Sequence, residues 1–452
     1  MSIGFRWICG LVLLAIVPSL QAQTPLSLGE AFRRADALGY GNRVAIATAT
    51  AADARAAATL RGILPTVRAE AGWVRSTDPL ATFGFLMRQR QVTPQAFDPA
   101  SLNFPAARSD VGTGVVVEGP LLNVDAWAGR SAAGHAAAAA GANAEWVASG
   151  ARLDVVRAYF GAVLATEQVA TLEAANTAAR AHVRQAESAV ANGMVTRSDA
   201  LLASVKQGEV ETRLVAAHGQ ASLARLQLAL LLGTPNDTAF TLPLAVPRSM
   251  DGAVDTTVPG ARADVRMAEA GVAAATSARR AANAALLPRV NGFARYDWHD
   301  PRSLAGGQSM WTVGVMASWS PFSGGAELAA RRNAAADVQA ARAGSEAVHA
   351  GAMLEVQSAD IAVTVATRGL AIASSAVTQA TEAHRIVGRK YDGGLAAVTE
   401  LLDAQATELG TRLAEAKARY DLLVARALQA RARGTDLTTI AAALDAADGI
   451  RE

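Results

Sequence analysis

The chain of 452 residues has a single cysteine, Cys9, which lies close to the N-terminus. A disulfide framework, a thiolate metal site and thiol catalysis are therefore excluded. The six histidines never occur at the spacing of metal ligands, and the chain has no His-Glu-x-x-His, phosphate-binding glycine loop or Gly-x-Ser-x-Gly motif. These absences predict a protein without a cofactor, without a metal and without enzymatic activity.

The chain also lacks a charge excess and a transmembrane helix beyond its start. Lys and Arg total 42 and Asp and Glu total 40, which leaves no basic field for a nucleic acid. Residues 1–22 combine Arg6, a short apolar stretch and a small-residue end at Ala22, and they predict a cleaved secretory signal. No later segment reaches the roughly 20 apolar residues of a membrane span. An exported protein of this kind is either periplasmic or contacts a membrane through strands.

A long internal duplication is the main feature that is present. The copies run from Pro120 to Thr234 and from Pro321 to Thr435, with a constant offset of 201 residues. Matched pairs include Leu153 and Leu354, Gly193 and Gly394, Asp199 and Glu400, Leu201 and Leu402, and Gly233 and Gly434. Solenoid repeats have periods of about 20–50 residues, so this is a large unit used twice.

Four segments, 66–75, 110–119, 289–298 and 310–319, alternate apolar and polar residues with a period of two. Each has the length of a tilted membrane strand, about ten residues, and 66–75, 289–298 and 310–319 carry aromatic residues near an end. A half-buried sheet in a soluble domain is the alternative. The residues predicted to face lipid are Val67, Trp73, Val115, Val117, Val290, Tyr296, Trp298, Trp311, Val315 and Trp319.

Long proline-free stretches follow both pairs of strands and predict helical hairpins. A coiled-coil seam in the first stretch is formed by Trp146, Leu153, Val156, Phe160 and Val163. The predicted organisation is a signal peptide at 1–22; a first repeat at 23–233 with a strand hairpin at 66–119 and a helical hairpin at 124–232; a linker at 234–259; a second repeat at 260–434 with a strand hairpin at 289–319 and a helical hairpin at 325–433; and a C-terminal tail at 435–452. Four strands leave two unpaired edges, which cost several kcal/mol per group in lipid, so a membrane location requires several copies.

Four segments carry a resemblance to a known family: 153–160, 192–199, 391–395 and 400–405. With the duplication and the strand lengths, the chain resembles the TolC-like outer-membrane efflux proteins over essentially the whole mature sequence. The resemblance implies a mostly α-helical fold with a membrane β-barrel. A homotrimer would form a twelve-stranded barrel in the outer membrane of a Gram-negative cell and a twelve-helix tunnel in the periplasm.

The resemblance also implies a function and its partners. The protein would be the passive exit duct of a tripartite efflux or type I secretion system. Its partners would be a periplasmic adaptor (membrane fusion protein), an inner-membrane pump of the RND type, with an ABC pump as the alternative, and outer-membrane lipid. The rival class is a periplasmic coiled-coil adaptor or scaffold without a barrel. No motif specifies the exported substrate.

Site residues follow from the same resemblance. Glu400 and Asp403 would form the pore constriction, although acidic residues also favour any helix start. Asp199 and Tyr391 would link neighbouring helices in the closed gate, where Ala396 replaces a usual arginine and weakens the predicted lock. The adaptor would dock at the turns formed by Gly193, Met194, Val195, Gly394 and Leu395, for which simple turn chemistry is the alternative. The first strand hairpin encloses 76–109, against only 299–309 in the second.

Overall fold

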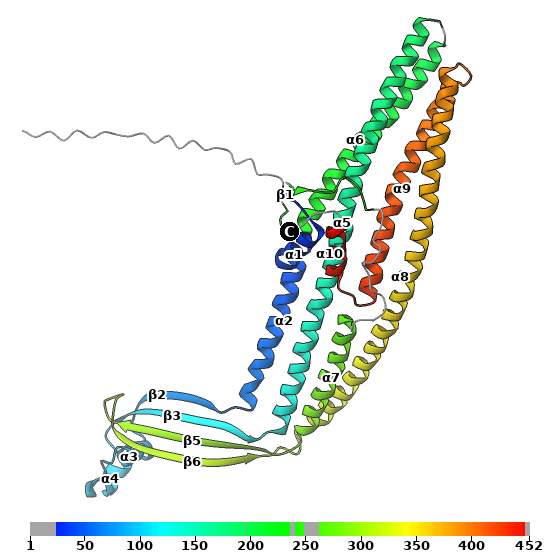
Figure 1. Ribbon diagram of the computed structural model, residues 1–452. Helices are drawn as coiled ribbons and strands as arrows, with labels where there is room; N and C mark the ends of the chain where they lie inside the picture. The colour runs from blue at the N-terminus through cyan, green and yellow to red at the C-terminus, as the bar shows by residue number, and fades with distance from the viewer. Residues whose placement is uncertain (1–23, 194, 236–239, 248–261, 448–452) are drawn as a thin grey trace, which may run out of the picture.

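The computed structural model describes residues 24–193, 195–235, 240–247 and 262–447, so the predicted signal peptide lies outside the described residues. The molecule is elongated, with a four-stranded sheet at one end and the turns of two long helical hairpins at the other (Figure 1). Each repeat supplies one strand hairpin and one helical hairpin.

The first repeat starts with two helices separated at Gly39. The repeat also carries three short helices between its strands. Its elements are β1 (Thr24–Pro25), α1 (Leu28–Leu38), α2 (Tyr40–Ala58), η1 (Thr59–Gly62), β2 (Thr66–Ser76), α3 (Pro79–Arg88), η2 (Pro94–Phe97), α4 (Pro99–Asn103), β3 (Arg108–Leu122), α5 (Val124–Ala191) and α6 (Arg197–Leu231).

The linker and the second repeat follow the same order of elements, but the connection between the two strands is shorter. Their elements are β4 (Phe240–Thr241), α7 (Ala263–Ala284), β5 (Arg289–Asp300), β6 (Gln308–Ser318), α8 (Ala326–Asp392), α9 (Val398–Ala432) and α10 (Leu437–Ala447). α10 lies within 435–452, where only a C-terminal tail was predicted. It is short and follows the last repeated position, so neither the duplication nor a long helical pattern identified it.

The sheet joins the two repeats edge to edge. Its order is β2-β3-β5-β6 and every neighbouring pair is antiparallel. The central pair, β3 and β5, aligns Val111 with Asp300 and has an irregularity between Pro120 and Leu122. Proline has no N–H to donate, which explains the break in the ladder there. β2 and β6 are left as edge strands in the described chain.

The main hydrophobic core lies midway along the molecule, where α1, α5, α6, α9 and α10 meet. The predicted seam residues Leu153, Val156 and Phe160 on α5 are 4%, 0% and 2% exposed. From α10, Leu437 and Ile440 are buried in the same core. Full burial of such aliphatic and aromatic side chains contributes about 1.5–3 kcal/mol each, so α10 is an integral part of this core.

The linker is fixed between the two helical hairpins through Val246. Its backbone N–H donates to the Glu167 carboxylate of α5 at 3.0 Å, and the Arg419 guanidinium of α9 donates to its carbonyl at 2.6 Å. Glu167 and Arg419 also form an ion pair with each other. Because both charged groups are largely buried, their mutual pairing and these backbone bonds offset the cost of desolvation.

Candidate transport path

One face of the sheet is apolar and exposed. The register places Tyr296 beside both Val115 and Trp311, and Trp73 beside Val111. Nine of the ten residues predicted to face lipid lie within strands and share this face: Val67, Trp73, Val115, Val117, Val290, Tyr296, Trp298, Trp311 and Val315. The tenth, Trp319, follows β6 and donates its indole N–H to the Leu286 carbonyl at 3.0 Å. Val67, Trp73 and Val315 are 64–68% exposed, so no other described element of the chain covers these side chains.

The opposite face of the sheet carries a network of charges. The Arg68 guanidinium lies 3.4 Å from the Glu118 carboxylate on the neighbouring strand. Arg295 on β5 contacts Asp297 at 2.7 Å and Glu70 on β2 at 3.7 Å. A strand sequence that is apolar on one face and ionic on the other is typical of a wall between lipid and water.

The helical hairpins reverse at glycines at the opposite end of the molecule (Figure 1). Gly193 has φ 71° and Gly394 has φ 70°, a left-handed conformation that glycine adopts without steric cost. After the second turn, Leu395 is 83% exposed, whereas Val195 is half-buried. Met194 lies outside the described residues. The left-handed turn accounts for the two glycines and sets no requirement on the type of residue at Leu395.

The predicted constriction residues lie just after the second turn. Glu400 and Asp403 are exposed, while Leu401 and Leu402 between them are buried. The Glu400 carboxylate accepts the Ala397 backbone N–H at 3.4 Å, so it also caps the start of α9. No hydrogen bond or ion pair involves the Asp403 carboxylate in the part of the chain that the structure describes. Both carboxylates are therefore exposed to solvent on one side of α9.

The two predicted gate residues, Asp199 and Tyr391, line one cavity of about 580 Å³ between the turns. Ala396 lines it too. The Asp199 carboxylate accepts the Thr196 N–H at 3.1 Å and the Thr196 hydroxyl at 2.8 Å, and so completes a capping box. Within the described residues Asp199 and Tyr391 share the cavity without a direct hydrogen bond. The structure therefore brings one residue of each repeat to the same cavity.

A polar cluster that the sequence did not identify lies between the hairpins, beside a cavity of about 570 Å³. Glu408 on α9 accepts from Arg412 at 2.6 Å and Thr381 at 2.9 Å, and lies 2.5 Å from His384 on α8. Burial raises the pKa of Glu408, but these three partners together hold it below the ordinary value. Burial, and then the nearby His384, lower the pKa of His182. Arg412 follows Glu408 by one helical turn, but Thr381 and His384 belong to the neighbouring helix α8, so no local spacing predicts their contact with Glu408.

Comparison with known proteins gives a sequence match and a fold match. Residues 260–448, which include the whole second repeat, match the outer membrane efflux protein family. A membrane protein from Pseudomonas aeruginosa shares the fold with a TM-score of 0.77, 20% identity, and coverage of 90% of this chain and 93% of its own. VceC from Vibrio cholerae has a TM-score of 0.75 and 20% identity, with coverage of 90% of this chain and 96% of its own. The Campylobacter jejuni channel CmeC has a TM-score of 0.75 and 16% identity, with coverage of 92% of this chain and 90% of its own. Curated protein sequences give no match.

The resemblance to TolC-like outer-membrane efflux proteins is confirmed. The family match also confirms the predicted outer-membrane location and a transport class rather than an enzymatic one. At these identities the solved structures show that the fold is shared along almost the whole chain.

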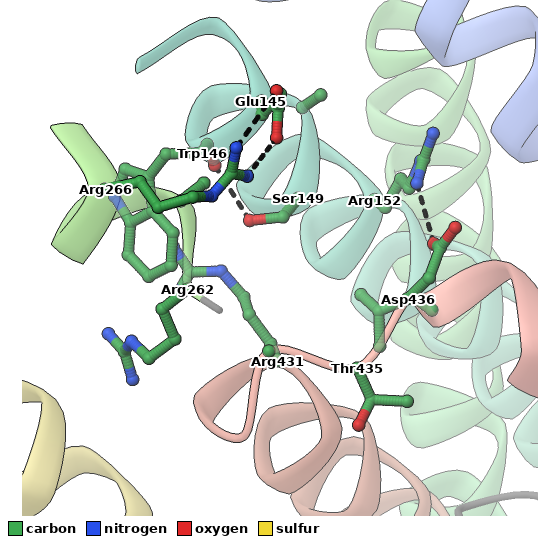
Figure 2. Close-up of a pocket in the computed structure, with 13 residues that line it drawn as sticks. Glu145, Trp146, Ser149, Arg152, Arg262, Arg266, Arg431, Thr435 and Asp436 are labelled. Atoms are coloured by element: carbon green, nitrogen blue, oxygen red, sulfur yellow. Dashed lines mark hydrogen bonds and ion pairs between the residues drawn. The ribbon is translucent and has the colours of Figure 1, made fainter. Parts of the chain in front are cut away.

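Where its two repeats meet, this TolC-like chain has a joint rich in arginine around a cavity of about 270 Å³ (Figure 2). The Arg431 guanidinium lies 3.7 Å from the centre of the Trp146 ring, and that of Arg262 lies 5.0 Å from it. Arg152 pairs with Asp436 at 2.7 Å, and Arg266 pairs with Glu145. Burial lowers the pKa of Arg431, which is stabilised by the aromatic ring instead of a carboxylate. The joint fixes α5 of the first repeat to α7 and α9 of the second.

Proposed function

We propose that this TolC-like protein is the exit duct of a tripartite efflux or type I secretion system. The duct is passive and is driven by an inner-membrane pump, of the RND type or alternatively an ABC pump, through a periplasmic adaptor. The observation that carries the proposal is the sheet, which has one exposed apolar face, one charged face and two free edges.

The free edges require other copies of the chain if the sheet lies in lipid. Each unsatisfied backbone group in the hydrocarbon region costs several kcal/mol, so only a closed barrel is stable there. Joining β6 of one copy to β2 of the next gives a barrel of twelve strands from three copies, within the known range for such barrels. Its apolar face then contacts lipid and its charged face lines a water-filled lumen.

The helical region supports the same assembly. On α8, four large aliphatic residues recur at the 7-4-7 spacing of a helix-packing seam and are 64–71% exposed: Leu354, Ile361, Val365 and Ile372. α8 also holds the one window in the described chain that is long and apolar enough to cross a membrane by length and composition, and none of that window is buried. The whole helix, on the order of 100 Å at 1.5 Å per residue, is much longer than a bilayer is thick. We assign the seam to contact with a neighbouring copy in a periplasmic tunnel.

The functional residues then take the following roles. Three copies bring Glu400 and Asp403 to one axis as two rings of carboxylates that constrict the tunnel and favour cations. Asp199 and Tyr391 hold neighbouring helices together at the closed end. The exposed turn at Leu395, together with Val195, offers an apolar contact to the adaptor.

Cysteine cross-linking tests barrel closure directly, because the only native cysteine lies in the predicted signal peptide. Within one chain β2 and β6 are separated by β3 and β5, so three strand spacings of about 4.8 Å each put them beyond disulfide reach. We expect Ala71→Cys, combined with single cysteines scanned along 310–316, to give dimers and trimers on non-reducing gels of outer-membrane fractions. The single-cysteine variants are the controls. A monomer for every pair would contradict the duct and would favour the periplasmic scaffold.

A further inference from the structure

A buried polar cluster lies at the end of the sheet that is farthest from the helices. Asp110 on β3 and His299 on β5 belong to the charged face, and His299 Nδ1 lies 2.7 Å from Asp110 Oδ2. They are 5% and 9% exposed, whereas Arg68 and Arg295 on the same face are exposed. Gln89 from the segment between β2 and β3 covers them, and its Nε2 donates to Asp110 Oδ1 at 2.9 Å and to the Ser109 carbonyl at 3.0 Å. Three polar groups thus satisfy one another out of water.

The covering segment, 79–103, is hereafter the strap; it contains α3, η2 and α4. Asp78 caps α3 with a 2.7 Å hydrogen bond from the Ala81 N–H, and Phe85 and Leu86 on the same helix are buried. These contacts give the strap a defined structure, unlike that of a tolerated surface insertion. Figure 1 shows α3 and α4 at the ends of the strands, opposite to the helical hairpins.

The strap also reaches the far edge of the sheet. Arg90 follows Gln89 and is the one non-glycine residue with positive φ, 53°, in the described chain. Its guanidinium donates to the Ser309 carbonyl on β6 at 3.5 Å. A left-handed arginine is unfavourable by itself and persists where surrounding contacts hold it. The strap therefore has contacts from β3 to β6, on the side of the sheet that carries the charges.

We propose that the strap forms a second constriction at the outer mouth of the duct and limits the size of what leaves. The proposal rests on the proposed function, because only a closed barrel turns the charged face into a lumen. Gln89 and Arg90 are positioning residues that hold the strap over this face. Three copies bring three straps toward one axis, at the opposite end of the path from Glu400 and Asp403. The carboxylates select by charge and the straps select by size.

The test uses the full-length protein in planar bilayers. Gln89→Ala/Arg90→Ala should release the strap, raise single-channel conductance by about twofold or more and admit larger polyethylene glycols from the outer side. Gln95→Ala is the matched control, because Gln95 lies in the same segment, is exposed and has no hydrogen bond through its side chain in the described chain. Its conductance and size limit should equal those of the wild type. Trypsin cleavage at Arg88 should become faster in the double variant only.

A second variant covers the case in which the released strap still obstructs the mouth. Replacing 80–104 by the short connection 301–307 of the second hairpin should give the widest channel of the series. Wild-type conductance and size limit in this deletion variant would overturn the proposal. Failure of the proposed function looks different, since then no variant, including Gln95→Ala, would form trimers or conduct ions.

Discussion

At the residue scale, the duplication places one carboxylate at the same point of both turns. Asp199 and Glu400 are 201 residues apart, and each caps the helix that follows its glycine turn, through Thr196 and Ala397 respectively. The next acid is not duplicated, because the partner position of Asp403 holds Leu202. A pair of acids on one side of the helix start is therefore a property of the second repeat alone, and this makes the second hairpin the candidate for the constriction.

We expect purified channels to be selective for cations and to be blocked by multivalent cations from the periplasmic side, with a block that weakens as salt increases. Glu400→Gln/Asp403→Asn keeps the size of both side chains and the capping oxygen, and should remove most of the selectivity and the block. Single-channel recording of reversal potential and block measures both. Intact selectivity in this variant would mean that the two acids serve only as a helix start.

Glu408 provides a pH test of the helical body. Its folded pKa is lowered by Arg412, His384 and Thr381 against the opposing effect of burial. A carboxyl group with a depressed folded pKa stabilises the fold above its unfolded value, near 4.5, and this contribution is lost as pH falls through the lower folded value. Glu408→Gln should thus lower Tm at neutral pH and reduce the loss of Tm below about pH 4.5. Glu346→Gln, at an exposed residue with no ion pair in the described chain, should follow the wild type.

At the element scale, the proposed contact with lipid rests on the four strands of the sheet. Alternation puts Val315 on the apolar face and Thr312 on the charged one, three residues away on the same strand.

The C-terminal ends of the long returning helices, α6 and α9, differ between the two repeats in what contacts their last carbonyl groups. In the second repeat, the Arg262 guanidinium donates to the Ala432 carbonyl at 2.9 Å. In the first repeat, the equivalent Leu231 carbonyl lies close to Gly39, since a Cβ atom added at Gly39 would be 3.4 Å from the Leu231 oxygen.

Arginine substitutions on β6 test the assignment of the faces. Val315→Arg should reduce assembly in the outer membrane, because arginine facing lipid near the midplane costs about 2–4 kcal/mol. Thr312→Arg should assemble normally, since it adds one charge to a face that already carries Arg68 and Arg295. The amount of folded trimer in outer-membrane fractions measures both. Equal assembly of the two variants would show that the faces are assigned wrongly.

At the scale of the whole molecule, the sheet and the turns lie at opposite ends, so the proposed membrane contact and the proposed adaptor contact are separated by the length of the helices (Figure 1). Met194→Asp/Leu395→Asp should abolish adaptor-dependent export without reducing trimer yield, because a charge at the junction would be desolvated without a partner. Leu244→Asp is the control, since Leu244 is 84% exposed but lies in the linker. Export assays in intact cells measure the outcome, and normal export by the double variant would remove the turns from the docking surface.

The sequence by itself determined the repeated pattern of strands, turns and long helices. Period-two alternation, glycine turns and proline boundaries are local signals, and they correctly predicted the seam at Leu153 and Phe160 and the left-handed turns at Gly193 and Gly394. The candidate acids Glu400 and Asp403 come from local spacing and family resemblance, and their role at a constriction stays a prediction.

Only the tertiary structure decided which distant residues meet. The contact of His384 with Glu408, the stacking of Arg431 on Trp146 and the cover of Gln89 over Asp110 join elements whose sequence separation carries no periodic signal. α10 became visible in the same way, because Leu437 and Ile440 acquire a partner only when the core between the repeats is assembled. Local patterns fix elements through backbone geometry, whereas burial and ion pairing depend on where the folded chain brings those elements together.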